Sequence, residues 1–182
     1  SNNTAVGQSA LLNNTTGTTN TAVGADALLR NVSGQGNTAS GFRALRANDG
    51  TRNTAHGFNA LRDNQDGDRN TGIGANALRA VTTGSQNTAL GDEALLNNSG
   101  SGNIAFGASA GSNLGTGDSN IMIGNAGVAA ESNTIRIGTS GTHTATLLAG
   151  DIIVEDPVPG EGNGGPGRQL VFEGNRSARI WL

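Results

Sequence analysis

The sequence predicts an all-β fold, a parallel β-roll of about eight stacked coils with 16 or 17 residues in each coil. Three observations support this prediction: a short string recurs at that spacing, Gly and Asn stand at fixed places within the repeat, and the composition is poor in core residues. Hydrophobic residues make up 34% of the 182-residue chain and aromatic residues 3%, whereas Gly alone accounts for 30 residues. Thin stacked coils need less apolar volume per residue than a thick globular core.

The recurring string opens with Asn and nearly always ends in Gly. Its copies read NTAVG, NTAVG, NTASG, NTAHG, NTGIG, NTALG, NIAFG, NIMIG and NTIRIG. They begin at Asn3, Asn20, Asn37, Asn53, Asn70, Asn87, Asn103, Asn120 and Asn133. The period is too short for a propeller blade or a pair of helices, and it fits a single coil of a solenoid.

Two segments of each coil are expected to form strands. Alternation over the first four positions indicates one strand, and the Ala-Leu segment at the eighth and ninth positions indicates a second. Gly and Asn between them supply tight turns. The strings ALL and ALR also favour a helix, but three or four residues between turn signals are too few for a stable helix.

Stacking would place each residue beside its own copy in the next coil, about 4.8 Å away. The Leu residues of the ninth position would then be buried, and the Thr residues of the second position would form a β-branched row on a pleated surface. Asn residues recur at the first and twelfth positions. We expect these two Asn rows to hydrogen-bond along the stack and to satisfy loop backbone groups.

The fourth position predicts association between copies of the chain. It is apolar in most coils but holds Ser40 and His56 in two of them, so it is not a sealed core. The third and fifth positions are almost all Ala or Gly, which permits close approach. One thin roll would leave an apolar face open, and cyclic closure is the natural assembly for an elongated chain. We therefore expect a homo-oligomer.

With the strings NTAVG and ALL, the segment from Asn3 to about Gly138 resembles the head repeats of trimeric autotransporter adhesins, which also occur in phage tail fibres and bacterial surface proteins. The resemblance implies a left-handed roll, a homotrimer, and binding to host matrix or cell-surface partners. It also implies an extracellular place, on a cell surface or a virion fibre. The best-known heads of the family have a shorter coil, so longer turns are expected here.

Four segments are expected along the chain: a β-roll repeat domain at 1–138, a transition or cap at 139–156, a linker at 157–167 and a C-terminal strand segment at 168–182. The linker contains all three prolines of the chain. The transition is needed because the end of a solenoid is an open sheet edge.

Composition and charge argue against several functions. The chain has 11 basic against 14 acidic residues, which gives no footprint for nucleic acid, and it has no Cys for disulfides or thiolate chemistry. No apolar run is long enough to span a bilayer. The two histidines, His56 and His143, have no Ser or carboxylate at triad spacing. The acids are scattered over turns and form no glycosidase pair. We expect no enzymatic activity and no cofactor.

A calcium site is one weak candidate. Asp63, Asp66 and Asp68 in the string DNQDGD resemble a calcium-binding loop, but the bidentate Glu of an EF-hand is missing. A solvated turn is the alternative interpretation. Calcium is thus the one metal that the sequence suggests.

An arginine stripe is the candidate ligand surface. Arg46, Arg62 and Arg79 share the tenth position of three successive coils. When stacked, these like charges repel one another unless acids such as Asp63 or an anionic ligand lie between them. The stripe could contact acidic glycans or a sulfated matrix, and a solvated face that aids solubility is the alternative.

These observations predict a structural and adhesive extracellular fibre module. It would project from a cell or a virion as a trimeric head and bind surface or matrix ligands, without inserting into a membrane. The alternative is a filament or lattice protein whose rolls stack end to end without a dedicated ligand. Ice binding through the Thr row is a third hypothesis, but the row changes to Ile104 and Ile121.

Overall fold

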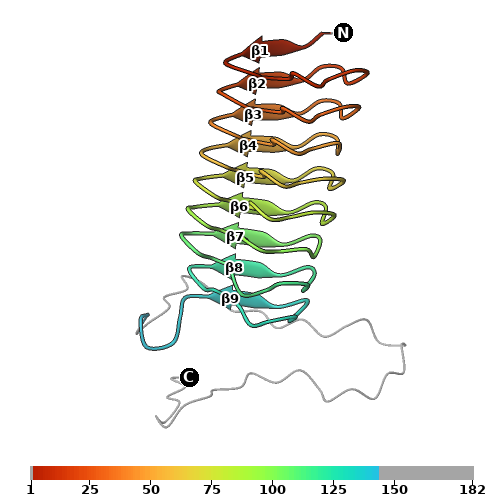
Figure 1. Ribbon diagram of the computed structural model, residues 1–182. Helices are drawn as coiled ribbons and strands as arrows, with labels where there is room; N and C mark the ends of the chain where they lie inside the picture. Colours follow the sequence, from red (N-terminus) through yellow and green to blue (C-terminus); the bar gives the residue numbers. More distant parts are fainter. Residues whose placement is uncertain (1, 144–182) are drawn as a thin grey trace, which may run out of the picture. The chain divides into compact units, whose positions relative to one another are not determined.

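The computed structural model describes residues 2–143, which all belong to one compact unit (Figure 1). This unit is an all-β parallel solenoid of about eight turns, and the described residues contain no helix. The fold class predicted from the sequence is confirmed at this level. Most of the predicted transition segment, the linker and the C-terminal strand segment lie outside the described residues.

Each coil contributes one strand of three residues, and Figure 1 shows the strands stacked in chain order. The nine strands are β1 (Thr4–Val6), β2 (Thr21–Val23), β3 (Thr38–Ser40), β4 (Thr54–His56), β5 (Thr71–Ile73), β6 (Thr88–Leu90), β7 (Ile104–Phe106), β8 (Ile121–Ile123) and β9 (Ile135–Ile137). All neighbours are parallel, and each residue pairs with its own copy, as Thr4 does with Thr21. We number the rows of residues along the stack from the repeat Asn, which is row 1.

The prediction of a second strand in each coil is wrong. Rows 6 to 11 form turns, and the non-glycine residues of rows 7 and 9 have left-handed backbone, with φ between 50° and 58°. This segment still pairs with its neighbours in both directions. The amide of Asp26 donates to the oxygen of Gln8 at 2.9 Å, and that of Leu28 donates to Ala44 at 3.0 Å. These bonds and burial offset the roughly 1–2 kcal/mol that left-handed backbone costs a residue such as Leu.

The core of each coil is a single thin layer. Ala residues of rows 3 and 8 and the Leu residues of row 9 are buried, and the Leu side chains from Leu28 to Leu95 are fully inaccessible to solvent. The burial follows from the strand period, because row 3 points inward while rows 2 and 4 point outward. Small Ala side chains allow the two walls of the coil to approach closely.

The row 1 Asn residues form a continuous hydrogen-bond ladder, as the sequence predicted. The Oδ1 of Asn53 accepts the backbone amide of Asn70 in the next coil at 2.8 Å. Its Nδ2 donates to the carbonyl of Gly67 at 2.8 Å, across its own coil. The same pair of contacts repeats from Asn3 to Asn103. One buried side chain therefore satisfies a strand amide and a loop carbonyl in every coil.

The row 12 Asn residues form a second ladder that is broken. Asn31, Asn48 and Asn64 each donate to the Oδ1 of the preceding Asn at 2.6–3.1 Å. The next coil has Val81 in this row, and the ladder stops there. The prediction for row 12 is confirmed for the first half of the solenoid.

The row 5 glycines are required by both backbone and space. Gly57 has φ of 138°, and a Cβ there would lie 2.4 Å from the oxygen of Gly74 in the next coil. Neighbouring corners of the coil are therefore in direct backbone contact. Only glycine adopts this positive φ readily and also leaves room for the Gly74 oxygen, because glycine has no Cβ.

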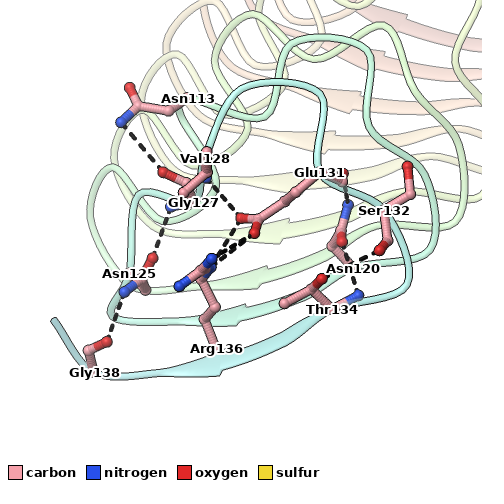
Figure 2. A network of polar contacts seen from close by, with 10 residues as sticks. All are labelled: Asn113, Asn120, Asn125, Gly127, Val128, Glu131, Ser132, Thr134, Arg136 and Gly138. Atoms are coloured by element: carbon pink, nitrogen blue, oxygen red, sulfur yellow. Dashed lines mark hydrogen bonds and ion pairs between the residues drawn. The ribbon is translucent and has the colours of Figure 1, made fainter. Parts of the chain in front are cut away.

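A polar network closes the last described coils (Figure 2). The carboxylate of Glu131 accepts the amide of Val128 at 2.6 Å and pairs with Arg136 at 2.8 Å. Arg136 stands in row 3, where preceding coils hold Ala, Gly or the buried Met122. An inward charge at this position ends the apolar layer.

The register of the ninth copy differs from the prediction by one residue. Thr134, not Asn133, takes the row 1 position, since its amide donates to Asn120 Oδ1 at 3.0 Å and Ile135 pairs with Ile121 (Figure 2). Asn133 belongs to the preceding row, where its amide donates to Asp118. This shift keeps Ile135 and Ile137 on the outside of the sheet and in line with the strand before them.

Candidate interaction surface

Rows 2 and 4 together form the outer face of the sheet. In most strands the row 3 residue between them is buried and both neighbours are at least partly exposed. We call these two rows, from β1 to β9, the outer sheet face. None of its residues is Asp, Glu, Lys or Arg. An uncharged strip of this kind that runs over all nine strands is a candidate contact surface.

The outer sheet face is largely apolar. Eight of its ten large apolar side chains have exposed fractions from 37% to 66%, and the other two, Leu90 and Ile121, are half-buried. The eight are Val6, Val23, Ile73, Ile104, Phe106, Ile123, Ile135 and Ile137. Ser40 and His56 interrupt the strip in β3 and β4. An exposed apolar patch that extends over several strands is typical of a contact site.

The arginine stripe is partly neutralised. Arg62 pairs with the adjacent Asp63 through contacts of 2.6–3.1 Å, and this hydrogen bond raises the pKa of the Arg62 guanidinium. Arg46 and Arg79, one coil to either side, make no ion pair among residues 2–143, and their Nε atoms are buried without a partner. Asp63 therefore pairs with one of these three cations, and Arg46 and Arg79 have no carboxylate partner in the described residues.

The three candidate calcium ligands have separate roles. Asp63 pairs with Arg62, and Asp66 is exposed on the loop. The Oδ1 of Asp68 accepts the amide of Thr51 in the preceding coil at 2.7 Å. Within the described part of the chain no group of three His, Cys, Asp or Glu side chains is placed to hold a metal ion. The structure thus does not bring these carboxylates together.

The two histidines lie in different settings. His56 is exposed on the outer sheet face, in β4. The Nδ1 of His143 accepts the amide of Thr139 at 2.8 Å and closes the turn after β9.

Sequence reasoning missed an aromatic cluster beside the sheet. Phe42 and Phe58 occupy row 6 of adjacent coils, and their rings stack with centroids 5.5 Å apart at 15°. The guanidinium of Arg43 lies over the Phe42 ring at 4.6 Å and pairs with Asp26 of the preceding coil at 3.4 Å. The signal was present in the repeat, because the two Phe residues stand one coil apart in a row that is otherwise small or polar.

The described residues include no helix that is long and apolar enough to cross a membrane. Comparison with protein-family models, with curated proteins and with solved structures finds no match for this chain.

Proposed function

We propose that the chain is a structural and adhesive extracellular fibre module that works as a homotrimer of side-by-side solenoids. In this proposal the outer sheet faces lie between the copies, and the rod projects from a cell surface or a virion. The trimer number, the left-handed coil and the extracellular place rest on the resemblance of the NTAVG and ALL repeats to adhesin heads.

The observation that carries the proposal is the outer sheet face itself. Complete burial of one Val, Ile or Phe side chain is worth about 1.5–3 kcal/mol, and these side chains are about half exposed. Roughly 1 kcal/mol for each of the eight would offset much of the cost of association, which is on the order of 4–15 kcal/mol. The repeat extends any favourable contact along the rod, because every coil presents the same rows.

The arginine stripe is the proposed ligand surface. It lies in row 10, outside the sheet, so that contact through the outer sheet face leaves it available. Arg46 and Arg79 have no carboxylate partner among the described residues and suit sulfate or carboxylate groups of a matrix glycan. Three copies would present the stripe three times, which strengthens weak single contacts.

Mass in solution, measured by light scattering, tests the proposal. We expect the particle of the parent protein to have the mass of three chains. Ile123→Glu places a charge on the outer sheet face and is expected to give a folded protein of one chain mass. Leu12→Glu is the matched control, because Leu12 is an exposed apolar residue of row 10, away from the sheet. A parent protein that remains a folded monomer would contradict the proposal, and a mass that rises without limit would favour the filament alternative.

A further inference from the structure

We propose that the exposed ring of Phe58, together with Asp92, forms a slot for an arginine side chain of another protein. This site is separate from the outer sheet face and from the arginine stripe, and it goes beyond the proposed function. The inference rests on the stacking order in row 6 and on a cation site that the chain already makes one coil away.

Row 6 is a straight column of residues. The amide of each row 7 residue donates to the row 6 carbonyl of the preceding coil, as Asn59 does to Phe42, Asn76 to Phe58 and Glu93 to Ala75. These bonds fix the order Phe42, Phe58, Ala75 and Asp92 at one strand spacing per step. Phe58 and Asp92 are therefore roughly 10 Å apart along the stack, with only a methyl group between them.

The first half of the column already holds a guanidinium. Arg43 lies over the Phe42 ring and pairs with Asp26, so its cation is shared between an aromatic ring and a carboxylate. Guanidinium groups favour this arrangement because they are planar and weakly hydrated. In this cluster a guanidinium of the chain itself contacts an aromatic ring and a carboxylate together.

The second half has an exposed ring and two carboxylates but no cation, and its carboxylates stand two coils beyond the ring, whereas Asp26 stands one coil before Arg43. Phe58 is 52% exposed, and the small Ala75 in the next coil leaves room beside the ring. Asp92 and Glu93 follow in the coil after that, both exposed and without an ion pair in the described residues. A planar guanidinium placed on Phe58 over Ala75 would continue the stack and reach a carboxylate, as Arg43 does.

The charge of the site also favours a donor. Asp92 and Glu93 are exposed carboxylates. A guanidinium carries five N–H donors in a planar fork that matches a carboxylate, whereas an apolar side chain would meet neither the charge nor the oxygens. Charge complementarity and the ring together point to arginine.

Titration with a hexaarginine peptide, followed by NMR of the Phe rings, tests the slot. The chain has four Phe, one Trp and no Tyr, so the Phe58 signals are readily assigned. We expect them to shift on addition of peptide, and we expect hexalysine to bind about threefold more weakly. Phe58→Ala and Asp92→Asn should each weaken binding about threefold, which is the range of an exposed cation–π contact. Ala75→Leu should abolish it by filling the slot without adding an aromatic face.

Leu12→Ala is the matched control, since Leu12 is 67% exposed and lies outside both the outer sheet face and the slot. It should bind the peptide as the parent does. Equal binding of both peptides, unchanged in Phe58→Ala, would overturn the proposal and indicate general attraction to an acidic chain. The proposal would also be overturned if Phe58→Ala changed the mass of the particle in solution and the parent protein did not respond to the peptide. That result would indicate that Phe58 lies in a contact between copies of the chain. A monomer that binds the peptide would contradict the proposed trimer alone.

Discussion

Asn98 follows Val81 by one coil in row 12, and its buried Nδ2 has no hydrogen-bond partner within the described residues. In the first half of the solenoid, the equivalent Nδ2 atoms donate to the Asn of the preceding coil, as Asn64 does to Asn48 at 2.6 Å. Val81 offers no acceptor at that place. The Asn98 amide is also turned, because its Oδ1 accepts the Gly100 amide, whereas the Nδ2 of Asn64 donates to the Gly67 carbonyl. The apolar residue in the ladder therefore removes one of the two acceptors that the other Asn residues of this row have.

Val81→Asn should repair the ladder. The new side chain would accept from Asn98 and donate toward Asn64, and relief of one buried unpaired group is worth about 1–3 kcal/mol. The loss of a buried Val side chain offsets part of this gain, so we expect a net stabilisation of about 1 kcal/mol. Urea unfolding followed by circular dichroism gives the value. Val81→Ala, which removes volume without adding a polar group, should destabilise, and a less stable Val81→Asn protein would contradict the account.

Asn70→Ala should destabilise the solenoid by about 3 kcal/mol or more. The Asn70 side chain accepts the amide of Asn87 at 2.9 Å and donates to the carbonyl of Gly84 at 2.7 Å. Its removal leaves two buried backbone groups unpaired, at about 1–3 kcal/mol each. Asn97→Ala serves as the control, because Asn97 is exposed on the turn, and its unfolding midpoint should match that of the parent. Equal effects of the two substitutions would mean that the ladder contributes little.

The sequence predicted those parts of the fold that depend on repetition. Identical residues in register must stack, so the Asn ladders, the buried Leu row and the Thr row of the strands followed from spacing alone. The inward position of the Ala between Thr and the fourth residue was not predicted. The backbone of rows 7 and 9 was not predicted either. Leu28 and Asp26 have left-handed backbone without the Gly that normally signals it, because bonds to neighbouring coils stabilise what the isolated segment disfavours.

The candidate sites, like the fold, were predicted from the sequence only in part. The sequence left open whether acids such as Asp63 or an anionic ligand lie between the stacked arginines, and the structure pairs Asp63 with Arg62. The cluster of Phe42 and Phe58 required a comparison of row 6 between two coils of unequal loop length. The register of β9 was missed because the loop before it is shortened, so that the Asn signal moved by one residue relative to the strand.

Gly57→Ala should be among the most damaging small substitutions. The new methyl group would lie 2.4 Å from the Gly74 oxygen, and the residue has φ of 138°. Both a backbone clash and an unfavourable conformation result, so we expect a loss of about 3 kcal/mol or more, or failure to fold. Gly115→Ala separates the two causes, because Gly115 has φ of 63° but nothing within 4 Å of the added Cβ.

The Gly115 variant should lose only about 1 kcal/mol, which is the cost of left-handed backbone for a residue with a Cβ. Thermal unfolding of both variants measures the difference. If the two midpoints fall equally, close contact between the coil corners is not what requires glycine in row 5.

Lowering the pH should destabilise the end of the solenoid, because it protonates Glu131. The hydrogen bond from Arg136 lowers the pKa of the Glu131 carboxyl, with the Val128 amide acting in the same direction and burial opposing them. A lowered folded-state pKa means that the stabilisation is complete above the ordinary Glu pKa and is lost as the pH falls through the lowered value. Amide hydrogen exchange at Val128 should therefore accelerate as the pH falls from neutral to about pH 3. The Asn70 amide in the middle of the ladder is the reference, and both rates are corrected for intrinsic exchange.

Glu131→Gln keeps the shape of the side chain but removes the titration, so its Val128 amide should exchange faster at neutral pH and respond little to acid. An equal acid response in the parent and in Glu131→Gln would show that another group governs this end.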